Sequence, residues 1–178
     1  PARPIAGLQV TIHSMDRRPD PGRSAVGPLY SPFGSLGSMD GESVDICIVG
    51  AGLSGLHLAH RLEGSGLDCL LLDKGRSPGG RAATRRIGEA RVDHGLPWLT
   101  AGGDLSSQLI EGFRRDGLLE PVDAGGSAGF AWASPNGISS LMKNLASGRR
   151  IGLSTRVLSV SPEGEAIRLK VEDGEGDR

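Results

Sequence analysis

The stretch Val44–Asp73 decides the fold of this chain, and it reads VDICIVGAGLSGLHLAHRLEGSGLDCLLLD. An apolar run rich in β-branched residues leads into the glycine turn Gly50–Gly55. Apolar residues then recur at helical spacing, and a second apolar run ends on an acid. A strand, a glycine turn, a helix and a second strand in this order are typical of the βαβ unit that binds dinucleotides. The sequence therefore predicts a Rossmann-like α/β domain.

Each glycine of the turn has a mechanical reason to be there. Gly50 makes the tight turn out of the strand, Gly52 lets the backbone approach a diphosphate, and Gly55 lets the helix pack closely on the sheet. The helix that starts here directs free N–H groups and its positive dipole end at the phosphates. Asp73 follows the first glycine by 73 − 50 = 23 residues, close to the spacing of about 20 at which a carboxylate reaches the ribose hydroxyls. The alternative is a glycine-rich turn that binds no ligand.

Composition and charge exclude several classes of binding partner. The 178 residues carry a formal net charge of −1, which argues against a nucleic-acid partner or an anionic membrane surface. No apolar run approaches the ~18 residues of a membrane span. Cys47 and Cys69 are interpreted as small buried hydrophobes in a reducing, cytoplasmic compartment. His57 and His60 lack cysteine or carboxylate partners at suitable spacing, so no metal site is expected.

The chain divides by composition near residue 42. Residues 1–42 mix Pro, Gly, Ser and Arg with few apolar residues, which predicts a disordered N-terminal extension; a targeting peptide and a regulatory arm are the alternatives. Residues 43–178 are predicted to form the nucleotide-binding domain. Turn residues follow the last predicted strand at Asp173–Asp177 with no return strand after them, so we expect the domain to be C-terminally truncated. Further local predictions are a loop over Gly75–Arg86, a helix from Leu105 to about Asp116 with Asp104 as N-cap, and strands over Ile151–Val160 and Ala166–Val171.

A second glycine loop, Asp73–Thr84 with the sequence DKGRSPGGRAAT, points to a longer cofactor. Its adjacent glycines allow unusual backbone angles and a close approach to a ligand. Arg81 directly after them offers a planar fork to phosphate oxygens or to the polar edge of a flavin. A nicotinamide-binding domain does not need this loop, whereas an FAD-binding domain must hold both the pyrophosphate and the flavin of its cofactor. The alternative for Arg81 is a solvated surface arginine, which is how Arg85, Arg86 and Arg91 are interpreted.

With these two motifs the sequence resembles the FAD-dependent amine oxidase superfamily, and most closely its renalase-like bacterial branch. The similarity covers about Ser43 to Val171, through the segments Asp93–Gly95, Gly117–Pro121, Ser134–Leu141 and Arg156–Val157. The resemblance implies a Rossmann-like FAD-binding domain of the p-hydroxybenzoate hydroxylase type. In that arrangement FAD lies extended across the domain, and a second, β-rich substrate domain covers the flavin; its start is missing or truncated here.

The resemblance also implies a set of cofactor-binding residues. Ser54 lies at the phosphates, Asp73 at the ribose and Val157 near the adenine. Leu96–Trp98 stands where the family has Ala-Gln-Tyr beside the flavin. Pro97 removes an amide side chain and a backbone donor, while Trp98 keeps an aromatic wall. The full set is Gly50, Ala51, Gly52, Ser54, Gly55, Asp73, Lys74, Gly80, Arg81, Pro97, Trp98 and Val157.

The function implied by the resemblance is that of an FAD-dependent oxidoreductase. Renalase-like enzymes oxidise dihydro isomers of NAD(P)H by hydride transfer to the flavin, with O2 as the acceptor. The cofactor carries the chemistry, so no acid–base residue is assigned. A small-molecule substrate is the expected partner. The alternatives are a flavin amine oxidase and, from another class, a truncated FAD-binding module without turnover.

Overall fold

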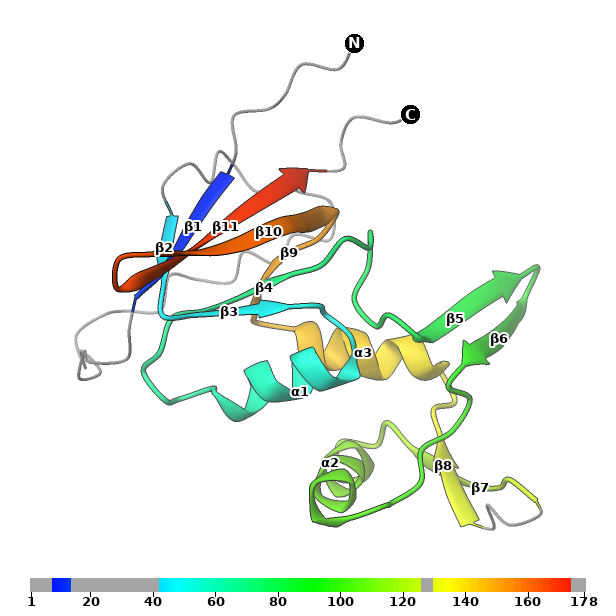
Figure 1. Cartoon of the computed structure of the whole chain (residues 1–178). Helices are drawn as coiled ribbons and strands as arrows, with labels where there is room; N and C mark the ends of the chain where they lie inside the picture. The colour runs from blue at the N-terminus through cyan, green and yellow to red at the C-terminus, as the bar shows by residue number, and fades with distance from the viewer. Residues whose placement is uncertain (1–7, 14–41, 126–129, 174–178) are drawn as a thin grey trace. The chain divides into compact units, whose positions relative to one another are not determined.

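The computed structural model describes residues 8–13, 42–125 and 130–173 (Figure 1). The chain divides into two compact units. The first joins Pro1–Pro78 to Ala146–Arg178, and the second is Gly79–Leu145.

A three-stranded parallel sheet forms the centre of the first unit. Its strands are β3 (Ile46–Val49), β4 (Cys69–Leu72) and β9 (Arg150–Gly152), in the order β3-β4-β9. The helix α1 (Leu53–Arg61) connects β3 to β4 and buries Leu56 and Ala59. A parallel pair needs such a crossover, and the glycine turn places the helix directly after the strand. The predicted βαβ unit and Rossmann-like fold are therefore confirmed.

A second, four-stranded sheet completes the first unit, in the order β10-β11-β1-β2. Val44, Leu70, Leu72, Leu169 and Val171 form one buried cluster with members from both sheets. This cluster is the core that packs the two sheets together. The strands are β1 (Leu8–His13), β2 (Glu42–Val44), β10 (Thr155–Glu163) and β11 (Ala166–Asp173), and β10 and β11 form an antiparallel hairpin.

The strand β1 differs from the disorder predicted for residues 1–42. It pairs antiparallel with β11, from Leu8 opposite Val171 to His13 opposite Ala166. Its sequence LQVTIH alternates apolar and polar residues and is rich in good strand formers, and β11 offers an open edge. β1 thus supplies the neighbour that β11 was expected to lack. Residues 1–7 and 14–41 lie outside the described residues.

The described residues of the second unit form two hairpins and two helices. The predicted loop over Gly75–Arg86 is wrong at its end, because residues from Ala82 onward form β5 and pair with β6. The helix α2 starts at Asp104 with Gly103 as its N-cap, one residue earlier than predicted. It buries Ile110 and Phe113. The elements are β5 (Ala82–Ile87), β6 (Ala90–Gly95), α2 (Asp104–Arg115), β7 (Glu120–Asp123), β8 (Phe130–Ala133) and α3 (Ile138–Ala146), whose last residue is assigned to the first unit.

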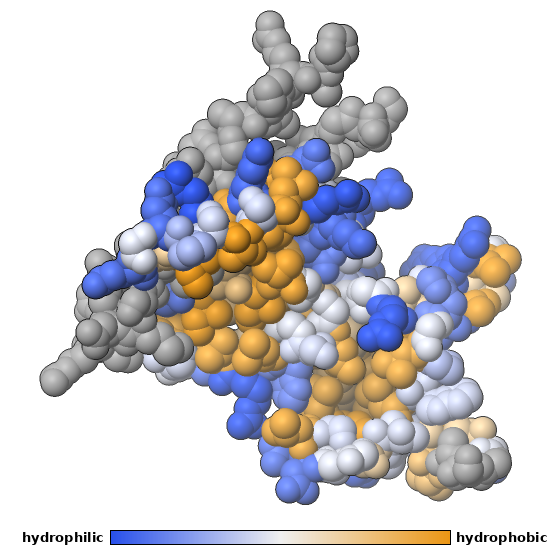
Figure 2. Space-filling model, viewed as in Figure 1, coloured by the Kyte–Doolittle hydropathy of each residue, from blue (hydrophilic) through white to orange (hydrophobic). Residues whose placement is uncertain are grey.

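Apolar side chains are not confined to the core. Figure 2 shows hydrophobic residues over β10 and β11 on the face turned to the viewer, and Leu158, Val160 and Ile167 are exposed on these strands. None of the helices in the described part of the chain is long and apolar enough to cross a membrane.

Candidate dinucleotide-binding site

The glycine turn between β3 and α1 needs glycine at two positions. Gly50 has a φ of +109°, in the region that favours glycine, and its N–H donates to the Leu72 carbonyl at 2.8 Å. A Cβ at Gly55 would lie 2.0 Å from the carbonyl oxygen of Gly50 and 3.2 Å from Cγ2 of Ile48. The helix therefore starts directly against the end of β3, which a side chain at residue 55 would prevent.

Among the residues that the structure describes, no side chain caps the N-terminus of α1. Gly52 is the N-cap residue, and the first turn contains no acidic residue. The first intrahelical bond runs from the Leu56 N–H to the Gly52 carbonyl at 2.9 Å. The N–H groups of Leu53, Ser54 and Gly55 precede that bond and have no carbonyl one turn earlier to accept them. This end of the helix therefore has the donors and the positive dipole that suit a phosphate.

Space is open where a diphosphate would approach the turn. A Cβ built on Gly52 would meet no heavy atom within 4 Å, and the Gly52 backbone is extended, with φ −77° and ψ 179°. Neither packing nor backbone conformation therefore requires glycine at residue 52. A ligand at this position would supply the reason for the missing side chain.

Asp73 at the end of β4 is held against the glycine turn. Its Oδ2 accepts the Ala51 N–H at 2.6 Å, and its Oδ1 accepts the Gly75 N–H at 2.6 Å. Its backbone N–H donates to Gly152 and its carbonyl accepts from Thr155, each at 2.8 Å. Each carboxylate oxygen has two lone pairs, so each can accept a further hydrogen bond. The carboxylate is thus fixed beside the turn and can still accept ribose hydroxyls.

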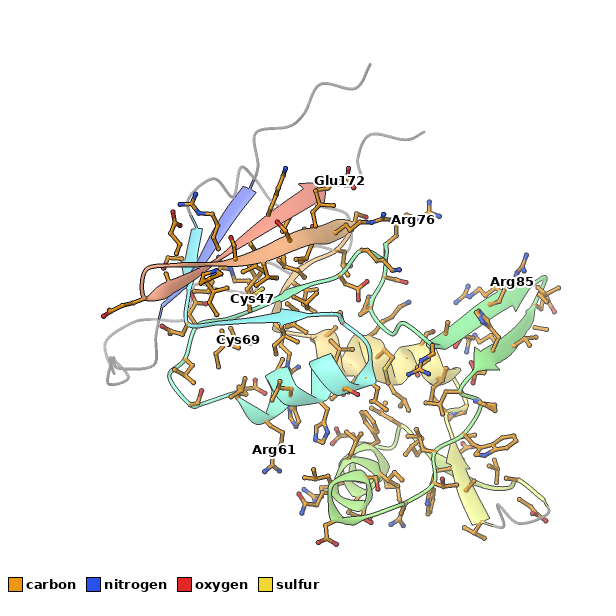
Figure 3. All side chains as sticks on the ribbon, in the orientation of Figure 1. Cys47, Arg61, Cys69, Arg76, Arg85 and Glu172 are labelled. Atoms are coloured by element: carbon orange, nitrogen blue, oxygen red, sulfur yellow. The ribbon has the colours of Figure 1, made fainter. Side chains whose placement is uncertain are left out.

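The cysteines of the parallel sheet are neutral packing groups. Cys47 and Cys69 lie on the neighbouring strands β3 and β4 (Figure 3), and both are free thiols of intermediate exposure. Burial raises the pKa of the Cys47 thiol to about 11, and burial also raises the pKa of Cys69 to about 11. Cys47 packs against the cluster that joins the two sheets.

The second glycine loop packs against its own unit. Gly79 and Gly80 have φ values of +128° and +57°, so the pair adopts the unusual backbone angles that were predicted. A Cβ at Gly79 would lie 2.7 Å from the Ala82 carbonyl oxygen and 3.1 Å from Cγ of Met142 in α3. Gly79 is therefore required for packing against the protein's own atoms and not for contact with a ligand. Gly80 and Arg81 are exposed.

The segment with the atypical sequence Leu96–Trp98 is also accessible. Pro97 is exposed, and Trp98 retains 38% of its accessible surface. The next residue, Leu99, pairs with Trp132, with hydrogen bonds of 2.7 and 2.9 Å between their backbones. This bridge fixes the chain just after Trp98 and leaves the indole surface available.

The sequence gives little sign of a network at the start of α3. Both carboxylate oxygens of Asp93 lie 3.0 Å from the Ile138 N–H, so Asp93 caps the helix from 45 residues away. Thr84 donates to Asp93 Oδ1 at 2.5 Å and accepts the Ser139 N–H at 3.0 Å. Gly137 has a φ of +83°, and a Cβ there would lie 2.6 Å from the Thr84 side chain. The sequence would have predicted this network only if Thr84 and Asp93 had been recognised as opposite residues of one hairpin.

The predicted site residues fall into two groups. The structure brings the glycine turn Gly50–Gly55 and Asp73 together in the first unit, where Lys74 is exposed and Val157 packs partly buried against the core cluster. Gly80, Arg81, Pro97 and Trp98 belong to the second unit.

The histidines of α1 are occupied by other contacts. His60 Nδ1 lies 2.7 Å from Nη2 of Arg149 and 3.4 Å from Oε2 of Glu63, and the His57 ring stacks on that of His60. No group of three or more His, Cys, Asp or Glu residues is placed to hold a metal ion within the ranges that the structure describes.

Comparison with known proteins agrees with this geometry. Residues 48–116 match the family described as NAD(P)-binding Rossmann-like domain. The match agrees with the Rossmann-like fold that the structure shows over these residues. The match spans α1, Asp73, the second glycine loop and α2. No curated protein matches the sequence.

Comparison with solved structures finds similarity to parts of three larger proteins. BexE, studied for oxidation during BE-7585A biosynthesis, is 18% identical with a TM-score of 0.50, over 73% of this chain and 28% of BexE. CabE, an aromatic hydroxylase from angucycline biosynthesis, is 22% identical with a TM-score of 0.48, over 76% of this chain and 28% of CabE. A putrescine oxidase is 26% identical with a TM-score of 0.36, over 44% of this chain and 17% of the oxidase. The chain spans less than a third of the length of each.

Proposed function

We propose that this chain is the FAD-binding part of an oxidoreductase. The observation that carries the proposal is the uncapped N-terminus of α1 beside a fixed Asp73 carboxylate, with open space at Gly52. In this proposal the N–H groups at Leu53–Gly55 bind the diphosphate and Asp73 accepts the ribose hydroxyls. Ala51 and Lys74 flank these two groups, and Val157 lies toward the adenine.

FAD is proposed in preference to NAD(P) because of residues in the second glycine loop and at Trp98. Gly80 and Arg81 are exposed, and a guanidinium can hold phosphate oxygens or the polar edge of a flavin. The exposed surface of Trp98 suits a flat ring. The description of the matched family favours NAD(P) as the second candidate. Both cofactors contain the ADP group that the glycine turn would bind.

The finer proposal is a renalase-like oxidation of a dihydronicotinamide. FAD supplies a hydride acceptor when bound, and O2 is the proposed final acceptor. The residues proposed to contact the cofactor are those of the glycine turn in the first unit, and Arg81, Pro97 and Trp98 in the second unit. What supports the branch is the resemblance of the glycine loops; an amine or another small molecule is the alternative substrate.

Reconstitution with FAD tests the proposed cofactor. The purified chain is incubated with FAD or with NAD⁺, desalted and measured for bound nucleotide and for visible flavin absorbance. We expect FAD to be retained in preference to NAD⁺. Absence of flavin absorbance after reconstitution contradicts the proposal, and retention of NAD⁺ alone establishes the second candidate.

A matched pair of variants tests the assignment of Arg81. Arg81→Ala should weaken FAD retention more than Arg86→Ala, because Arg81 directly follows the double glycine whereas Arg86 lies near the tip of the β5–β6 hairpin. Equal retention by the two variants contradicts the role of Arg81. For the substrate class, anaerobic mixing of the reconstituted protein with dihydropyridine isomers or with amines shows which compound bleaches the flavin absorbance.

A further inference from the structure

The network at the start of α3 ties together three segments that are far apart in the sequence. Thr84 comes from β5, Asp93 from β6, and the two amides belong to Ile138 and Ser139. Thr84 and Asp93 are paired in the hairpin register, so their side chains share one face of the ribbon. The hairpin is thereby fixed to the helix by both of its strands.

The same hairpin carries the proposed ligand residues at its base. Ala82 pairs with Gly95, so Arg81 immediately precedes one strand and Leu96 immediately follows the other. A Cβ at Gly95 would lie 2.3 Å from the Arg81 carbonyl oxygen, which shows how closely the two ends approach. Movement of the hairpin against α3 would therefore move the backbone at Arg81.

Trp98 is held between two fixed points. Asp93 anchors the chain before it, through the hydrogen bonds to α3. The Leu99–Trp132 bridge anchors the chain directly after it. Only Leu96, Pro97 and Trp98 lie between the end of β6 and this bridge. The position of the indole thus depends on the Asp93 anchor.

We propose that Asp93 and Thr84 are positioning residues for cofactor binding. By locking the β5–β6 hairpin to the N-terminus of α3, they fix the backbone at Arg81 and Trp98, the residues of the second unit that are proposed to contact the flavin. This inference rests on the proposed FAD binding. The side chains of Asp93 and Thr84 hydrogen-bond within the protein, and neither residue is proposed to contact the ligand.

A purely structural cap makes a different prediction from a positioning residue. If the network only stabilises α3, its loss lowers the melting temperature and leaves ligand affinity unchanged in the folded protein. If it positions Arg81 and Trp98, its loss weakens FAD binding at temperatures where the variant is fully folded. Binding of ADP, which lacks the flavin, is expected to be unaffected because its proposed site lies in the first unit.

The experiment uses the full chain with Asp93→Asn, Thr84→Val and Thr84→Ser. Asp123→Asn is the matched control, because Asp123 accepts an N–H from Gly125 in the other hairpin of the same unit. Melting temperature, the dissociation constants of FAD and ADP, and the visible spectrum of bound flavin are measured well below the lowest melting temperature. The Asn side chain keeps one acceptor but loses the charge that strengthens both contacts of Asp93.

The expected result is a loss specific to FAD. Asp93→Asn and Thr84→Val should weaken FAD binding by about tenfold, the usual scale for one charge-assisted hydrogen bond, and shift the flavin spectrum. ADP binding should stay unchanged, Thr84→Ser should restore wild-type behaviour, and Asp123→Asn should change neither ligand. If Asp93→Asn does not fold, the Thr84 pair decides the question alone.

Two results overturn the inference. Unchanged FAD affinity and spectrum in folded Asp93→Asn and Thr84→Val would show a cap that only stabilises the helix. Equal weakening of ADP and FAD would show a general loss of integrity. Failure of the proposed function is recognised separately, because the wild-type chain would then retain no FAD.

Discussion

Replacing Asp73 by Asn tests whether this carboxylate acts on the ribose alone or also on the glycine turn. The carboxylate accepts the Ala51 N–H through Oδ2 and the Gly75 N–H through Oδ1, both at 2.6 Å. An Asn side chain has one acceptor oxygen, so one of the two N–H groups would face an NH2 group instead. Hydrogen bonds to charged groups contribute about 1.5–3 kcal/mol each, so we expect the free energy of unfolding to fall by about 2–3 kcal/mol.

The binding assay separates the two roles of Asp73 through the ligand. Titration calorimetry compares ADP with 2′,3′-dideoxy-ADP, which has the diphosphate but lacks the ribose hydroxyls. For ADP, loss of a charged hydrogen bond of about 2 kcal/mol corresponds to about 30-fold weaker binding. For the dideoxy ligand, the structure predicts a smaller but measurable loss, because the peptide at Ala51 is no longer held by the carboxylate.

Two results of the comparison between ADP and dideoxy-ADP would contradict the roles assigned to Asp73. An unchanged affinity for dideoxy-ADP in Asp73→Asn would show that the contact to Ala51 does not shape the turn. An unchanged affinity for ADP would remove Asp73 from the site altogether. Asp45→Asn is the control, because Asp45 accepts a backbone N–H from Asp68 in the same unit at 2.8 Å and plays no part in the proposed site.

Three further predictions follow from the packing. Gly55→Ala should lower the free energy of unfolding by about 3 kcal/mol or more, since its Cβ would lie 2.0 Å from a backbone oxygen. Gly112→Ala in α2 meets open space and should raise the free energy of unfolding by about 0.5–1 kcal/mol. Chemical denaturation measures both changes. Gly137→Ala should lower the free energy of unfolding by about 2 kcal/mol or more, because residue 137 has a left-handed φ and its Cβ would contact the β5–β6 hairpin. An unchanged denaturation midpoint would contradict this reason. Cys47 and Cys69 should resist iodoacetamide at pH 9 in the folded chain and react on unfolding. Their pKa is raised from 9.0 to about 11, so the stability contributed by the neutral thiols is present below pH 9 and is lost as pH rises toward 11; equal rates in both states would contradict the burial.

The parts of the fold that sequence predicts well are local. The glycine spacing at Gly50–Gly55 and the distance to Asp73 reflect one turn and one crossover, and the βαβ unit is confirmed. The apolar run from Val44 is not one strand, however, because Val44 belongs to β2 and β3 begins at Ile46. The strand predicted over Ala166–Val171 is also confirmed, as β11, which forms a hairpin with β10. However, the predicted strand over Ile151–Val160 is two strands, since its start joins the parallel sheet as β9 and its end joins the other sheet.

The parts that sequence missed depend on distant partners. Leu8–His13 becomes a strand through its pairing with β11, more than 150 residues away, and no local pattern reports that edge. The apolar residue Leu105 in the first turn of α2 is 62% exposed, whereas the helix buries Ile110 and Phe113. The cap of α3 by Asp93 combines residues 45 positions apart. In each case the deciding neighbour is set by tertiary packing.

Comparing ADP binding by Gly52→Ala and by the wild-type chain tests whether a nucleotide diphosphate binds at the glycine turn. The added methyl group meets no protein atom within 4 Å and the backbone conformation there suits alanine, so the melting temperature should not change. The methyl group would occupy the space through which the diphosphate reaches the helix N-terminus, and we expect ADP affinity to fall by at least about tenfold. Equal ADP affinity in the two proteins, at equal thermal stability, would mean that the nucleotide does not bind at this turn.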